Sequence, residues 1–197
     1  MTTERTRQDT RGQILGAAVS LVGREGVSGL TIERVAGEAG LSKGGVFYHF
    51  PSKEALIEGM IGRALEDAER EIAWLASSEA EVPGGFARAY ARATFGHKGS
   101  AHLDVSGGLL AAVANDPDLL EPLRARYGAW QDRLLRDGID PATATLVRLA
   151  ADGLWFADLF GFAAPEGRLR KELLAALLSL TDKTRDGRRR VPLKERP

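Results

Sequence analysis

Apolar residues recur at intervals of three and four along most of the chain, a spacing typical of amphipathic helices. The longest such run follows Ser52 and covers more than twenty residues: Leu56, Ile57, Met60, Ile61, Ala64, Leu65, Ala68, Ile72 and Leu75. The chain has no β pattern of note. We therefore expect an all-α protein of about nine helices, in which the long helix links an N-terminal three-helix domain to a C-terminal helical bundle.

Capping residues and glycines predict three helices in the N-terminal part of the chain. A first helix is predicted from about Thr10 to Gly26. Residues 1–9 carry Arg5 and Arg7 but lack apolar periodicity, so they are predicted to form a mobile arm that either touches the minor groove or backbone of DNA or is a solvated tail. Thr31 can cap a second helix, which Gly40 ends because glycine readily adopts a left-handed conformation. Ser42 can cap a third helix, from Lys43 to about Phe50.

The second and third helices are joined by a short turn that contains glycine, as in a helix-turn-helix. Val46, Phe47 and Phe50 are predicted to anchor the third helix. Gly44 and Gly45 each destabilise a helix by about 1 kcal/mol relative to alanine. This cost suggests that the side chains are absent so that the backbone of another molecule can approach closely. The predicted DNA-binding residues are Thr31, Ser42, Lys43, Gly44, Gly45, Tyr48, His49 and Lys53.

The run LSKGGVFYHFPSKEAL, preceded by TIERVAGEAG, resembles the DNA-binding domain of the tetracycline-repressor (TetR) family of bacterial transcription regulators. The resemblance covers about residues 10 to 60, and beyond residue 60 only the all-helical pattern matches. It implies a homodimeric repressor that releases its operator when a small molecule enters the C-terminal domain. Because a homodimer carries two DNA-binding domains related by two-fold symmetry, the predicted operator on double-stranded DNA is palindromic.

Further helices are predicted at about 85–97, 101–114, 117–138, 141–163 and 166–182. The helix at 141–163 is apolar on most faces and must be covered on several sides. We therefore expect a homodimer that pairs through 141–163 and 166–182. The predicted domains are a DNA-binding head at 1–52, a ligand-binding and dimerisation domain at 53–182, and a basic tail at 183–197. The tail is either solvated or makes weak contacts with DNA.

Charge is distributed unevenly although the 197 residues sum to zero: residues 1–53 carry +2, residues 54–182 carry −7 and residues 183–197 carry +5. An acidic body favours DNA contact through the head. The absence of cysteine excludes disulfides and thiolate metal sites. The N-terminus is unlike a signal peptide and no apolar run approaches the roughly 20 residues that span a bilayer, so we expect a cytoplasmic protein without a membrane partner.

Candidate chemistry is sparse. His97 and His102 do not form a recognised metal motif, and no catalytic or nucleotide-binding motif is present. We therefore predict no catalytic residues, no cofactor, no metal and no enzyme activity. The competing hypothesis is an enzyme or small-molecule carrier whose helix-turn-helix is structural, and DNA binding distinguishes the two.

Six aromatic residues of the C-terminal part form either ordinary core or, by family resemblance, the lining of a ligand pocket: Phe86, Tyr90, Tyr127, Trp130, Trp155 and Phe156. The expected effector is a small hydrophobic or amphipathic molecule, and the acidic body favours a cationic one modestly. Asp152 and Asp158 lie in the most apolar helix, where an unpaired charge is costly. They are predicted to be solvent-exposed or to pair with arginine, for example across a dimer interface, or else to attract a cationic ligand.

Overall fold

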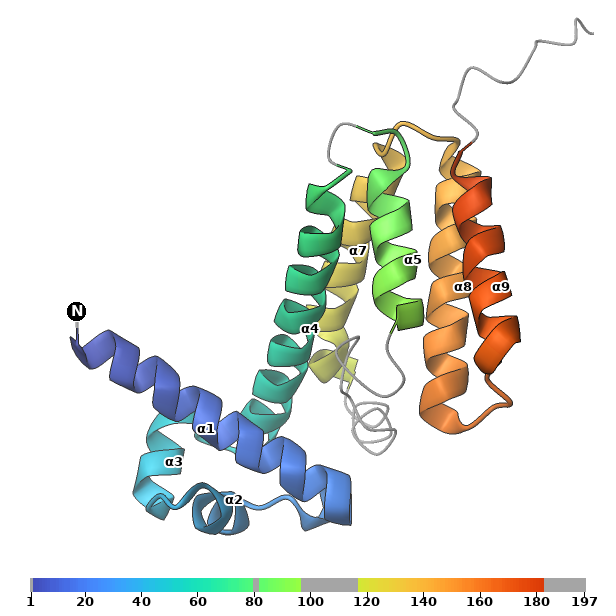
Figure 1. Ribbon diagram of the computed structural model, residues 1–197. Coiled ribbons are helices and arrows are strands. Elements are labelled where there is room, and N and C mark those ends of the chain that lie inside the picture. The colour runs from blue at the N-terminus through green and yellow to red at the C-terminus, as the bar shows by residue number, and fades with distance from the viewer. Residues whose placement is uncertain (1, 80–81, 97–116, 183–197) are drawn as a thin grey trace, which may run out of the picture. The chain divides into compact units, whose positions relative to one another are not determined.

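The computed structural model describes residues 2–79, 82–96 and 117–182 (Figure 1). These residues form eight α-helices, two 3-10 helices and no strand, which confirms the all-α prediction. The α-helices are α1 (Thr2–Glu25), α2 (Ile32–Ala39), α3 (Lys43–His49), α4 (Lys53–Ser77), α5 (Gly85–Gly96), α7 (Glu121–Leu135), α8 (Pro141–Phe160) and α9 (Gly167–Leu180). The 3-10 helices are η1 (Val27–Gly29) and η2 (Pro117–Leu120).

The described residues fall into two units: one contains 2–69 and 117–127, and the other contains 70–79, 82–96 and 128–182. Helices α4 and α7 each contribute residues to both units. The helix predicted at 101–114, the pair His97 and His102, and the basic tail at 183–197 lie outside the described residues.

Helix α1 begins at Thr2, so the prediction of an irregular arm before Thr10 is wrong for residues 2–9. No proline or glycine precedes Gly12 in the sequence. Once the apolar stripe of α1 is packed, adding further polar turns fixes one residue for each hydrogen bond and needs no new nucleus. Missing apolar periodicity therefore indicates solvated turns here, and it does not exclude a helix.

The helix ends of the first unit follow the predicted caps. The Thr31 hydroxyl accepts from the Arg34 backbone N–H at 3.3 Å, and the Ser42 hydroxyl accepts from that of Gly45 at 3.0 Å. Gly40 ends α2 with φ 65°, in the left-handed region that glycine adopts without strain. These caps fix where α2 ends and α3 begins, and so they fix the turn between them.

Helix α4 crosses the end of α3 closely at Gly59. A Cβ atom at this position would lie 2.6 Å from the Phe50 ring and 3.0 Å from the Leu15 side chain. Phe50 and Leu15 are each only 2% exposed, so neither side chain has free space to move into. The absent side chain of Gly59 is therefore what lets α1, α3 and α4 meet at this point.

Helix α5 is the centre of the second unit and packs against both α8 and α9, which lie side by side in Figure 1. Ten of its twelve residues are buried, and four of them are alanines that allow neighbouring helices to approach: Ala87, Ala89, Ala91 and Ala93. Such a sequence has no polar face because packed helices surround it.

Hydrogen bonds and an ion pair hold the N-terminal part of α5 in place. The Asp137 carboxylate accepts from the backbone N–H groups of Phe86 at 3.0 Å and Ala87 at 2.8 Å, two donors that the helix itself leaves unsatisfied. Burial raises the pKa of Asp137, and these two hydrogen bonds act in the opposite direction. The buried Arg88 guanidinium pairs with Glu79 and donates to the Thr181 hydroxyl at 3.1 Å, joining the residues after α4 and α9 to α5.

The polar interactions of α5 determine its orientation more than they raise the free energy of unfolding. Buried charges of this kind add little net stability compared with apolar side chains of the same volume, although removing one partner is costly. The bonds of Arg88 and Asp137 are directional, so they fix how α5 sits against its neighbours. We expect that they contribute to a single arrangement of helices more than to the total free energy of folding.

Two glycines of α4 offer a matched test of the crossing between α3 and α4. Gly59→Ala is expected to lower the free energy of unfolding, because overpacking a filled core costs about 1–3 kcal/mol and exceeds the roughly 1 kcal/mol that alanine gains in a helix. Gly62→Ala is the control, since no atom lies within 4 Å of its added Cβ, and it should be neutral or stabilising. Urea unfolding followed by circular dichroism measures both, and equal midpoints for the two variants would contradict the crossing described.

Candidate nucleic-acid interface

Helix α3 presents one face to solvent and buries the other. Val46 is fully buried and Phe50, its C-cap, is nearly so, as predicted, whereas Tyr48 is 68% exposed. The prediction that Phe47 anchors the helix is wrong, because its side chain is 43% exposed. An exposed apolar ring such as that of Phe47 can pack against a thymine methyl group in the major groove of DNA.

The two glycines of α3 differ in the space around them, and only Gly44 has room for a side chain. A Cβ added at Gly44 would meet only the Ser42 hydroxyl, at 4.0 Å, and one added at Gly45 would meet the same hydroxyl at 3.3 Å. The space that the missing side chains leave therefore opens outward from Gly44. Glycine is unfavourable inside a helix, yet no contact within the described residues requires a glycine at position 44.

The predicted cations differ in how firmly they are held. Lys43 pairs with Glu33 of α2, whose pKa this hydrogen bond lowers, and both side chains are more than half exposed. Such exposed pairs are worth about 0–1 kcal/mol, so phosphate can replace Glu33 at little cost. The Lys53 ammonium instead donates to the Val27 carbonyl at 2.7 Å, which fastens the start of α4 to η1.

The remaining predicted residues flank this face. Thr31 and Ser42 are exposed, with their hydroxyls engaged as helix caps. His49 is half-buried, its ring 5.2 Å from that of Tyr48. Burial lowers the pKa of His49, and the nearby charges of Arg7 and Arg11 lower it further. The same end of α3 is thus close to Arg7, which belongs to the predicted arm, and to Arg11, for which the sequence predicts no role.

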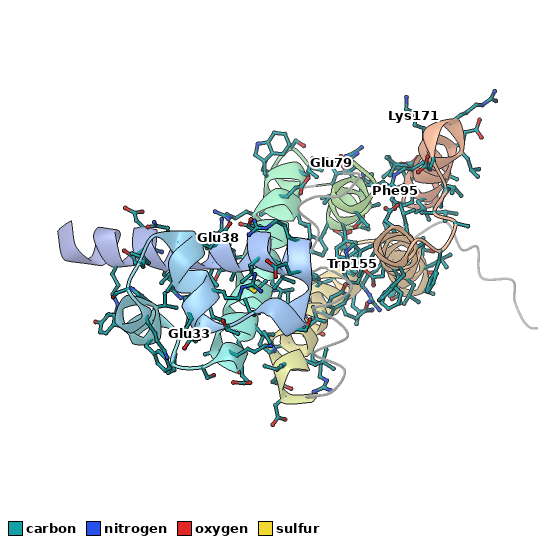
Figure 2. All side chains as sticks on the ribbon, turned by 90° about the horizontal axis from the view of Figure 1, so that it is seen from below. Glu33, Glu38, Glu79, Phe95, Trp155 and Lys171 are labelled. Atoms are coloured by element: carbon teal, nitrogen blue, oxygen red, sulfur yellow. The ribbon has the colours of Figure 1, made fainter. Side chains whose placement is uncertain are left out.

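The six aromatic residues predicted to line an effector pocket divide by burial. Phe86, Tyr90 and Trp130 are buried, with ring centroids 6.5 Å apart for the first two and 5.6 Å apart for Tyr90 and Trp130. Trp155 is half-buried on α8 (labelled in Figure 2) and touches the exposed Phe156, with centroids 5.7 Å apart. Tyr127 is half-buried on α7.

A hollow of about 290 Å³ in the second unit contains one of these rings. Its lining is largely polar and consists of Ala73, Ala76, Ser77, Glu79, Phe86, Arg133, Arg136 and Asp137. The Arg133 guanidinium lies 4.2 Å from the centroid of the Phe86 ring. This hollow is just below the 300–1,000 Å³ usual for small-molecule sites, and it lies beside the Asp137 cap.

The two aspartates of α8 pair with arginines within the chain, which confirms the predicted pairing with arginine. Asp152 accepts from the Tyr90 hydroxyl at 2.6 Å and from Arg148 at 2.8 Å. Asp158 accepts from Arg170 of α9 at 2.9 and 3.0 Å. The predicted need for a partner is met, because each carboxylate is fastened to an arginine of its own unit.

Neither a membrane span nor a metal centre is found among the described residues. No helix there is both long and apolar enough to cross a membrane. No group of three or more potential ligands among His, Cys, Asp and Glu in that part of the chain could hold a metal ion.

Comparison with known proteins gives matches along the chain. Residues 14–60 match the family model described as bacterial regulatory proteins of the tetR family, and residues 84–182 match the tetracyclin repressor-like C-terminal domain. The HTH-type transcriptional regulator TtgR of Pseudomonas putida is 31% identical over 80 residues, which are 41% of this chain. That alignment spans only 38% of the length of TtgR.

Solved structures are similar over most of the chain. A TetR-family member from Streptomyces coelicolor A3 is 26% identical, covers 85% of this chain and 97% of its own, and has a TM-score of 0.63. The multidrug binding protein EbrR, solved with ethidium, is 27% identical, covers 85% of this chain and 97% of its own, and has a TM-score of 0.61. With its helix-turn-helix and C-terminal helical unit, this chain belongs to the TetR family of bacterial transcriptional regulators.

Proposed function

We propose that this protein is a repressor that binds a palindromic operator as a homodimer and releases it when a small hydrophobic or amphipathic effector binds. Residues 1–52 are the DNA-binding head, and residues 53–182 bind the effector and hold the dimer together. The observation that carries the proposal is the outward face of α3, where Gly44 leaves space that no internal contact requires.

The roles on this face follow from the chemistry of each group. Lys43, Tyr48 and Lys53 contact phosphates, and Gly44, Gly45 and His49 lie near base edges or sugars. Thr31 and Ser42 complete the surface at the helix N-termini. With about three cationic contacts for each subunit, the logarithm of affinity should fall with the logarithm of salt concentration at a slope near −5. Lys53 contributes less than Lys43 if its bond to Val27 persists.

The exposed apolar surface of α8 and α9 supports the homodimer. Twelve large hydrophobic side chains are exposed among the described residues, and seven of these belong to α8, α9 or the link between them: Leu146, Leu149, Phe156, Phe160, Phe162, Leu169 and Leu173. Contiguous exposed apolar patches mark interaction sites. A second copy of the chain is the proposed occupant, since two-fold pairing is the commonest symmetry and matches a palindromic operator.

The effector is proposed to bind in the second unit among Phe86, Tyr90, Trp130, Trp155 and Phe156. Tyr127, the sixth predicted residue, belongs to the first unit. EbrR, which resembles this chain over most of its length, is a multidrug binding protein solved with ethidium and with proflavin. A cationic effector would have to compete with Arg148 for Asp152, or with Arg170 for Asp158. Apolar area therefore contributes more to binding than charge does. Movement of α4, which contributes to both units, is the proposed route of release.

Gly44→Leu tests the DNA-binding face. The side chain would project into open space, so the melting temperature should stay the same or rise, because leucine favours a helix over glycine. Binding to an operator selected from a random DNA library should be abolished, since the bulk separates α3 from the groove. Lys43→Ala is the companion variant and should weaken binding to all sequences and flatten the salt slope by about 0.9 for each phosphate that is no longer neutralised. Wild-type affinity in both variants would reject this face.

Leu149→Arg and Leu173→Arg test the dimer. Both leucines are exposed within one subunit, at 54% and 39%, so arginine there should leave the subunit folded. Paired against a second copy, the same arginines would bury unpaired charge, and sedimentation velocity should show monomers. Leu135→Arg is the matched control, as this leucine of α7 is 43% exposed and lies outside the proposed interface. A double variant that remains fully dimeric would place the interface elsewhere.

Tryptophan fluorescence tests the effector site, with ethidium and proflavin as the first compounds. Trp74 is 74% exposed and outside the proposed pocket, so the Trp74→Phe variant should be used to leave only Trp130 and Trp155 as reporters. An effector should quench or shift their emission. If it binds the DNA-free form about a hundredfold better, it weakens operator binding by about 2.7 kcal/mol. A compound that releases the operator without changing either tryptophan would place the site outside this pocket.

A further inference from the structure

Most of the cations in the first unit are engaged with oxygen atoms of the chain itself. Arg24 forms two hydrogen bonds to the Glu38 carboxylate, at 3.0 and 2.9 Å. The other engaged cations, each with an acceptor, are Arg34 with Glu25, Lys43 with Glu33, Lys53 with the Val27 carbonyl, Arg63 with the Gly12 carbonyl, Arg124 with Glu121 and Arg126 with Glu69. These contacts balance much of the positive charge of the first unit within the fold.

Arg7 and Arg11 of α1 are different. Neither guanidinium has a carboxylate or carbonyl partner within the part of the chain that the structure describes, and each is instead placed over an aromatic ring. The Arg7 guanidinium lies 5.2 Å from the centroid of the Tyr48 ring, and that of Arg11 lies 5.1 Å from the centroid of Phe50. Both residues are exposed, so two positive charges without an acidic partner among the described side chains lie at the surface.

The two arginines are four residues apart in one helix, so they share a face and lie about 6 Å apart along its axis. Their positions over Tyr48 and Phe50 place this face beside the C-terminal end of α3. An exposed cation–π contact contributes only about 0.5–1 kcal/mol, but it orients the guanidinium. The five N–H donors lie in the guanidinium plane and match the geometry of a phosphate group.

We propose that Arg7 and Arg11 form a second phosphate-binding surface, through which the N-terminal turns of α1 lie along the DNA backbone beside the groove that α3 enters. This inference rests on the proposed function of α3, and it adds contacts that the helix-turn-helix itself does not provide. Duplex DNA is the partner because the arginines continue the exposed face of Tyr48. Two further contacts for each subunit would steepen the salt slope from about −5 to about −9.

The positive potential of this surface already reaches α3, since the charges of Arg7 and Arg11 contribute to the lowered pKa of His49. A phosphate bound between these groups would reverse the local charge. This surface therefore favours an anion more than the surfaces around Arg24 and Arg34 do, because each of those arginines faces a carboxylate of its own.

The test uses the full chain and a fluorescein-labelled duplex of about 30 base pairs with random sequence, because phosphate contacts do not depend on sequence. Fluorescence anisotropy over a range of salt concentrations should show that Arg7→Gln and Arg11→Gln each weaken binding and flatten the slope by about 0.9 for each subunit bound. Arg24→Gln is the matched control: it removes the same charge from the same helix, about 25 Å further along its axis, and should leave the slope unchanged.

Charge-retaining variants separate a phosphate contact from a structural role. Arg7→Lys and Arg11→Lys should restore most of the salt slope, because lysine still binds phosphate as a point charge. Circular dichroism should show the same melting temperature for all variants, since both arginines are exposed. Slopes equal to that of the wild type in both glutamine variants would overturn the proposal, as would weaker binding confined to an operator selected from a random library.

The outcome for the wild-type chain separates the two proposals. If the wild type binds neither the random duplex nor any selected duplex, the proposed operator binding itself fails. If the wild type binds and Arg7→Gln, Arg11→Gln and Arg24→Gln all have its slope, only the second surface is rejected. The expected result is wild-type binding with the slope flattened in the first two variants alone.

Discussion

The packing of one aromatic ring holds the DNA-reading helix in place. Phe50 caps α3 and fills the space left by Gly59 of α4, at the crossing that the Leu15 side chain of α1 also reaches. Helix α3 has only seven residues and one fully buried side chain of its own, Val46. A helix this short is not stable alone, so its position depends on the ring that follows it. The orientation of its outward face is therefore set by contacts made on its inward side.

Local features of the fold can be predicted from the sequence because their causes are local. Thr31, Ser42 and Gly40 act within one helical turn of their own positions, and each is correctly identified as a cap or terminator. The start of α1 cannot be predicted from apolar spacing, because polar residues without glycine or proline form a helix once a neighbouring turn is packed. The exposure of Phe47 could not be predicted from the sequence. Apolar periodicity shows which face of a helix is buried, but it does not show how much of that face the neighbouring helices cover.

Tertiary contacts account for what the sequence does not provide. The partners of Asp152 and Asp158 are arginines on the same and a later helix, and choosing between pairing within the chain and pairing across an interface needs the helix arrangement. Arg7 is more than forty residues from Tyr48 in the sequence, so spacing cannot predict their contact. The DNA-binding and effector-binding residues themselves remain predictions, because a free chain shows which groups are exposed and not what they bind.

The outward face of α3 also bears on how such a protein changes over time. Gly44 has no atom but a serine hydroxyl near its absent Cβ, and Phe47 and Tyr48 are exposed. Stability is set by Val46, Phe50 and Gly59, which belong to the buried side. If the outward face reads DNA as proposed, selection for a new DNA sequence and selection for folding act on separate residues in and around the same seven-residue helix. A gene duplicate can diverge in the sites that it recognises while its head keeps the same core.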